Sequence, residues 1–140
     1  MSEPEEYYNL KKVPVLTSEE NFLIWRELFL AQAKKKGYKD VLTKDSPKIP
    51  KSTKENPSDD EKKLIQYNDS AFTDLMLAVD TKKQFGRTTF NILKSTKNKD
   101  FEDGNAREAW LLLDEKYNPK NAPNMSKVKK QYRNARLQKG

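Results

Sequence analysis

The sequence predicts an all-α fold, a compact bundle of about five helices plus one short helix, without strands. Three observations support this class. Apolar residues recur at intervals of three and four, as they do along one face of a helix. N-cap residues precede these stretches, and glycine or proline follows them. No stretch sustains the period-two alternation of a half-buried strand, so the signals agree with one another.

The clearest helix is expected over residues 105–117. Its apolar side chains form one stripe, which we interpret as core: Ala106, Ala109, Trp110, Leu113 and Tyr117. Its charged side chains are expected on the opposite face: Arg107, Glu108, Asp114, Glu115 and Lys116. Asp103 stands where an N-cap acceptor is expected, and Pro119 closes the segment.

A long helix is expected over residues 18–36. Thr17 and Glu20 have the spacing of a capping box, and Gly37 is a natural stop. One face of this helix is expected to carry the following residues: Phe22, Trp25, Leu28, Phe29, Gln32 and Ala33. We interpret Trp25 as a core anchor, with an exposed platform for stacking nucleic-acid bases as the alternative.

Three further helices complete the expected bundle, over residues 59–79, 82–95 and 124–139. Ser58 and Glu61 form a second capping-box pattern before the first of them. The apolar stripe of that helix is expected to consist of Leu64, Tyr67, Ala71, Leu75 and Ala78, widened by Ile65, Phe72 and Val79. The next helix presents Phe85, Thr89, Ile92 and Leu93. Gly86 weakens its helix propensity.

By length the chain is one domain. Residues 1–16 are expected to form an acidic flexible arm that ends in an extended segment, because Pro14 disfavours helix at the residue before it. Residues 17–140 are expected to form the helical domain. A short helix is expected over residues 38–42. Residues 44–57 contain three prolines and four lysines and are expected to be a disordered surface loop or linker.

Composition excludes several classes of function. The chain has no cysteine and no histidine, which excludes Cys/His zinc sites, disulfides, cysteine nucleophiles and imidazole bases. No glycine-rich phosphate loop, EF-hand pattern or signal peptide occurs, and no apolar run is long enough to span a membrane. We therefore expect an intracellular, cytoplasmic protein that is not an enzyme. No cofactor, metal, membrane or small-molecule substrate is expected.

The net charge of +7 is concentrated at one end of the chain. Residues 116–140 contain eight Lys or Arg and no acid, whereas the first 115 residues contain 20 basic and 21 acidic groups. Tentative nucleic-acid-binding residues are Lys120, Lys127, Lys129, Lys130, Arg133, Arg136 and Lys139. RNA binding of low sequence specificity is expected, because no base-reading aromatic motif is present. The alternative is a solvated helix that lacks acids.

Two motifs occur in order along the chain. The first is Leu16-Thr17-x-x-x-Phe22-x-x-Trp25, followed by Phe29, and the second is the stripe of residues 106–117, followed by Pro119. Together they resemble the Gag region of copia-type LTR retrotransposons over roughly residues 13–140. The resemblance implies a helical domain like the N-terminal domain of a capsid, which self-associates into particles around RNA. It also implies a family-signature core, made of Leu16, Phe22, Trp25, Phe29, Ala106, Ala109, Trp110, Leu113 and Tyr117.

The sequence departs from this family in two respects. Many Gag proteins of the class carry a Cys-Cys-His-Cys zinc knuckle, and their helical pattern continues beyond the position of Gly140. The leading hypothesis is a structural Gag-like protein whose main partner is a second copy of itself. The alternatives are a stand-alone basic helical nucleic-acid-binding module, and a truncated or domesticated Gag fragment that interferes with assembly.

Overall fold

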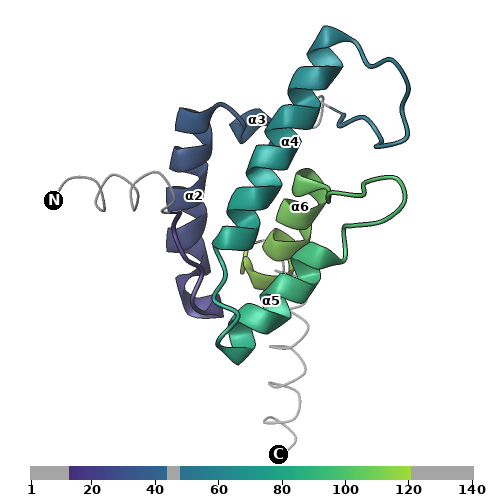
Figure 1. The fold of residues 1–140 in the computed structure, drawn as a ribbon. Coiled ribbons are helices and arrows are strands. Elements are labelled where there is room, and N and C mark those ends of the chain that lie inside the picture. Colours follow the sequence, from purple (N-terminus) through teal and green to yellow (C-terminus); the bar gives the residue numbers. More distant parts are fainter. Residues whose placement is uncertain (1–12, 44–47, 121–140) are drawn as a thin grey trace, which may run out of the picture.

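The computed structural model describes residues 13–43 and 48–120 (Figure 1). Its elements are a 3-10 helix, η1 (Glu19–Asn21), and five α-helices: α2 (Phe22–Lys36), α3 (Lys39–Thr43), α4 (Asp59–Leu77), α5 (Gln84–Lys94) and α6 (Ala106–Tyr117). The described part of the chain contains no strand, only an isolated parallel bridge between Leu16 and Val79. The predicted all-α fold is therefore confirmed. The helix predicted over 124–139 lies outside the described residues.

Helix α4 is the longest, and in the view of Figure 1 it lies between α2 and the pair formed by α5 and α6. The five-residue α3 packs against α2, α4 and α6 and so closes one end of the core. Helix α5 packs against α4 and α6 at the other end. Every pair of neighbours meets through apolar stripes, as expected of a small helical bundle.

Aromatic rings from α2 and α6 form the centre of the core. The centroids of Trp25 and Trp110 are 5.6 Å apart, and Phe29 lies 5.6 Å from Trp110. Phe22 meets Tyr117 at 5.9 Å. Such tilted pairs contribute roughly 0.5–1.5 kcal/mol each beyond the area they bury. The nine residues named above as the family-signature core are all buried: Leu16, Phe22, Trp25, Phe29, Ala106, Ala109, Trp110, Leu113 and Tyr117.

Two of the predicted helix caps are corrected by the structure. The first capping box is formed by Ser18 and Asn21 instead of Thr17 and Glu20, and it opens the 3-10 turn that precedes α2. The N-cap of α6 is Asn105, whose side chain accepts from the Glu108 amide at 3.1 Å; Asp103 does not have this role. In both cases a residue one or two positions further along had equally suitable chemistry, so spacing alone did not decide the cap.

The remaining boundary signals are confirmed. Ser58 and Glu61 form the predicted capping box of α4. Gly37 adopts φ 96° after α2, a left-handed conformation that glycine tolerates best. Helices α4 and α5 each begin or end within two residues of the predicted position. The short helix buries Val41 and Leu42 as expected.

Residues 48–57 form a loop that is hydrogen-bonded to the rest of the protein, whereas the sequence predicted a disordered loop for this stretch. The Ser52 amide donates to the Asp100 carbonyl at 2.6 Å, and the Ser52 hydroxyl accepts from the Glu102 amide at 2.9 Å. Ile49 packs against the core. These contacts join two loops that are fifty residues apart in sequence, which no local pattern reveals.

Two side chains lie on the opposite face from the one predicted. Leu28 was expected in the core, yet 54% of its surface is exposed. Asp114 was expected in solvent, yet it is buried against α2. Both errors concern positions at the edge of a helical stripe, where about 20–40° of rotation of the helix decides between core and solvent.

Gly86 is required by close packing and does more than weaken a helix. A Cβ atom at this buried position in α5 would lie 1.8 Å from the Asp80 carbonyl oxygen. The chain before α5 therefore crosses directly over the helix, at a separation that only glycine permits.

Gly86→Ala is accordingly expected to destabilise the fold by about 1–3 kcal/mol, because the overlap outweighs the roughly 1 kcal/mol that alanine gains in helix propensity. Chemical denaturation followed by circular dichroism measures this. Asn91→Ala, at an exposed position of α5, is the matched control and should be neutral or slightly stabilising. Equal stability of Gly86→Ala and the wild type would contradict this account of the crossing.

Candidate functional site

The outer face of α2 carries exposed apolar side chains. Ile24 is 67% exposed, Leu28 is 54% exposed and Leu23 is 40% exposed. Figure 1 places α2 at the edge of the bundle, and the exposure of these three side chains puts them on its solvent side. Since a surface helix normally keeps its outer face polar, three large apolar groups here mark a candidate interaction surface.

The opposite face of α2 is fully used by the core. Phe22, Trp25, Phe29 and Ala33 are all buried. The helix is thus apolar on both sides, a pattern typical of helices that are buried on both sides. The runs Leu23-Ile24-Trp25 and Leu28-Phe29-Leu30 already contain this signal, because consecutive apolar residues cannot all share one helical face. The sequence-based assignment of Leu28 to the core missed it.

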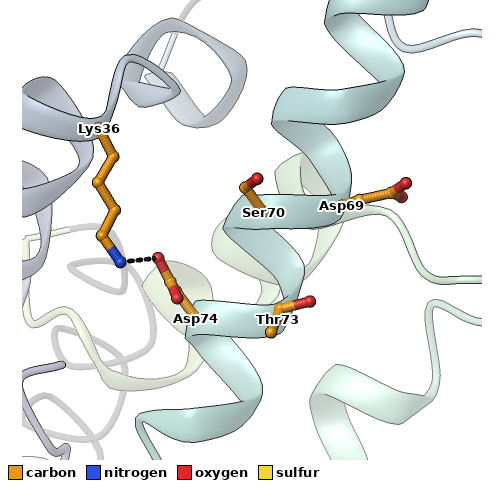
Figure 2. A pocket seen from close by; sticks show the side chains of 5 residues that line it. All are labelled: Lys36, Asp69, Ser70, Thr73 and Asp74. Atoms are coloured by element: carbon orange, nitrogen blue, oxygen red, sulfur yellow. Dashed lines mark hydrogen bonds and ion pairs between the residues drawn. The ribbon is translucent and has the colours of Figure 1, made fainter. Parts of the chain in front are cut away.

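A polar cluster fixes the C-terminal end of α2. Lys36 Nζ lies 2.9 Å from Asp74 Oδ2 (Figure 2). The Tyr38 hydroxyl donates to the same oxygen at 2.6 Å. Gln32 donates to the Tyr38 hydroxyl at 3.2 Å. Asp74 and Tyr38 are buried, so this cluster links α2, the following turn and α4 through charge-assisted bonds.

The same cluster borders a surface depression of about 340 Å³, lined by Lys36, Asp69, Ser70, Thr73 and Asp74. In Figure 2 the Asp69 side chain points away from the Lys36–Asp74 pair. Asp74 Oδ2 accepts from both Lys36 Nζ and the Tyr38 hydroxyl. The arrangement resembles a structural ion pair more than a nucleophile–base pair.

Burial raises the pKa of the Tyr38 hydroxyl above its ordinary value, and the hydrogen bond and charge of Asp74 raise the pKa further. The hydroxyl therefore stays protonated and keeps donating to Asp74. Burial, and secondly the charge of Asp103, raise the pKa of Asp69. Neither shift places a general acid or base beside a concave, enclosed site.

A second polar contact joins α2 to α6. Arg26 Nε donates to Asp114 Oδ1 at 3.0 Å, and Asn118 Nδ2 donates to the same atom at 2.8 Å. The Arg26 guanidinium also lies 5.5 Å from the Trp110 ring centroid. Within the described residues, every buried side-chain nitrogen and oxygen has a hydrogen-bond partner. These buried polar groups are explained by the fold.

Residues 13–43 and 48–120 contain neither a metal-binding cluster nor a membrane-spanning helix. In these ranges no group of three or more acidic side chains is arranged to hold a metal ion. None of their helices combines the length and the apolar character needed to cross a membrane.

Of the seven basic residues assigned tentatively to nucleic-acid binding, only Lys120 is described. Its amide donates to Asn118 Oδ1 at 2.9 Å, just after α6 ends. The other six lie outside the described residues: Lys127, Lys129, Lys130, Arg133, Arg136 and Lys139. The structure thus places Lys120 close to the C-terminal end of α6.

No family model, no curated protein and no solved structure matches this chain. The resemblance to copia-type Gag therefore rests on the two sequence motifs.

The Tyr38–Asp74 bond yields a pH prediction. Because the pKa of Tyr38 is raised on folding, its contribution to stability is complete below the unfolded-state pKa of about 10 and is lost as the pH rises beyond it. Tyr38→Phe should cost about 1–3 kcal/mol at pH 7, since Asp74 loses a buried donor. Urea titrations should show that the variant loses less stability than the wild type between pH 9 and pH 11.

Tyr67→Phe, at a partly buried position of α4 outside the Lys36–Tyr38–Asp74 cluster, serves as the control. It should follow the wild-type pH profile. An identical alkaline profile for Tyr38→Phe and wild type would show that this hydroxyl is not the titrating group.

Proposed function

We propose that this chain is a structural, Gag-like helical protein that self-associates and contacts RNA through its basic C-terminal segment. The observation that carries the proposal is the outer face of α2, with Leu23, Ile24 and Leu28 exposed together. Self-association covers such a face and regains the free energy of apolar burial, about 25 cal/mol per Å². The copia-like order of the two motifs supports the same role.

The charge distribution supports the RNA part of the proposal. A body of 115 residues with a net charge of −1 precedes 25 residues with eight cations and no acid. A polyanion would then be held by one segment while the body remains available for protein contacts. A cytoplasmic location and the absence of catalysis belong to the same proposal.

Two alternatives differ from this proposal in what they predict. A stand-alone nucleic-acid-binding module, favoured by the basic segment, would bind RNA and stay monomeric. A truncated or domesticated Gag fragment would associate with longer Gag chains and stop their assembly, because one contact surface alone cannot close a shell.

Sedimentation velocity over a hundredfold range of concentration tests self-association. The mass of the wild type should grow with concentration. The double variant Ile24→Gln/Leu28→Gln should shift this growth to concentrations about tenfold higher or more. The reason is that covering the exposed half of a leucine or isoleucine side chain on association contributes roughly 1 kcal/mol to the binding free energy. Leu111→Gln, at an exposed position on α6, is the control and should match the wild type. A wild type that is monomeric throughout would contradict the proposal.

RNA binding is tested by its salt dependence. Neutralising Lys127, Lys129 and Lys130 together to glutamine should weaken binding to single-stranded RNA and reduce the slope of log K against log salt by about 2, at roughly 0.7 per phosphate contact. The control neutralises three exposed lysines of the body, Lys82, Lys83 and Lys94. Equal slopes for the two triple variants would place the RNA contact elsewhere.

A further inference from the structure

We propose that the occupant of the outer α2 face is a second copy of the same helix, antiparallel to the first and related to it by a two-fold axis. This inference rests on the proposed self-association and specifies its geometry. It follows from the order of charged and apolar side chains along the exposed stripe of α2.

The exposed stripe runs the length of the helix and begins two residues before it. All its members are exposed, and they recur at intervals of three and four: Glu20, Leu23, Ile24, Glu27, Leu28, Ala31, Lys34 and Lys35. Ile24, Leu28 and Ala31 lie along its middle. The stripe is thus a continuous face of one rigid helix.

The charges on this stripe are segregated by sign. Glu20 and Glu27 occupy its N-terminal half, whereas Lys34 and Lys35 occupy its C-terminal end. A parallel pair of such helices would place like charges opposite each other. An antiparallel pair places the acidic half of each copy beside the lysines of the other, and this complementarity selects the antiparallel orientation.

Other charged groups near the face do not disturb this pattern. Lys36 forms an ion pair with Asp74, and Arg26 forms one with Asp114 on the core side of the helix. Both cations are therefore directed toward the body of the protein. Glu19, in the preceding 3-10 turn, is also exposed and adds to the acidic end.

The register follows from fitting large side chains to small ones. With the two-fold axis between Leu28 and Ala31, Leu28 of each copy packs on Ala31 of the other. In the same register, Glu27 of each copy lies near Lys34 of the other copy. These two residues are seven positions apart and therefore lie on nearly the same side of the helix. In an antiparallel pair, residues on the same side of the two helices meet across the two-fold axis. The two-fold axis therefore generates two identical copies of each of these contacts.

The contact is small. A helix of 15 residues is about 22 Å long, so one such pair gives a weak, reversible dimer. A two-fold contact also closes on itself and cannot extend a particle without a second surface. We therefore infer that this face supplies the dimer contact.

Charge reversal tests the orientation. Glu27→Lys alone and Lys34→Glu alone should each weaken self-association about threefold to tenfold in sedimentation velocity. The combined variant, Glu27→Lys/Lys34→Glu, should recover most of the wild-type behaviour, because the pairs are restored with opposite sign. In a parallel contact, like charges would face each other both before and after each single change. If both single variants associate as strongly as the wild type, the antiparallel orientation is overturned.

Cross-linking tests the position of the axis in the full chain, which has no native cysteine. Ala31→Cys lies next to the proposed axis and should form a disulfide-linked dimer under mild oxidation, at the concentrations where the wild type associates. Asn91→Cys, exposed on α5, is the control and should stay mainly monomeric. Equal cross-linking of the two variants overturns the proposed contact.

The two levels of proposal fail in different ways. A wild type that associates, but whose association ignores Glu27→Lys and Lys34→Glu and leaves Ala31→Cys unlinked, overturns the antiparallel α2 contact and keeps self-association. A wild type that is monomeric at every concentration overturns both. In that case the α2 face is covered by another segment of the chain or by a different protein.

Discussion

The packing of α2 on α6 is the contact on which the rest of the structure depends. The rings of Trp25 and Phe29 each lie 5.6 Å from the Trp110 ring, measured between centroids. The Arg26–Asp114 ion pair also joins the two helices. Residues far apart in sequence thereby fix one helix against the other, at both apolar and charged positions. The outer face of α2 has a defined direction because its inner face is held in this way.

The two ends of α2 are also anchored. At its beginning, the Trp25 indole donates to the Pro14 carbonyl at 2.9 Å, and the Leu16 amide donates to the Ala78 carbonyl at 2.8 Å. At its end, Lys36 and Tyr38 are tied to Asp74 on α4. A helix fixed at both ends presents its exposed stripe at little cost in conformational entropy on association.

The proposed roles are separated along the chain for an electrostatic reason. The body carries nearly equal numbers of acids and bases, so it can approach a second copy without strong repulsion, and its charges can be arranged in complementary pairs. Eight cations without an acid repel one another in protein contacts and suit a polyanion. All eight of these cations lie from Lys116 onward, so the two charge patterns occupy separate parts of the sequence.

The sequence by itself determined the helices and most of the core, because helical period and the caps at Ser58 and Gly37 are local signals. Tertiary structure decided what depends on the rotation of a helix and on distant neighbours. It exposed Leu28, buried Asp114 beside Arg26 and joined Ser52 to Asp100. It also required glycine at position 86, since only the folded chain brings the Asp80 carbonyl there. The bounds of a helix are set by local sequence signals, whereas the neighbour that a side chain meets across the core depends on how the helices pack.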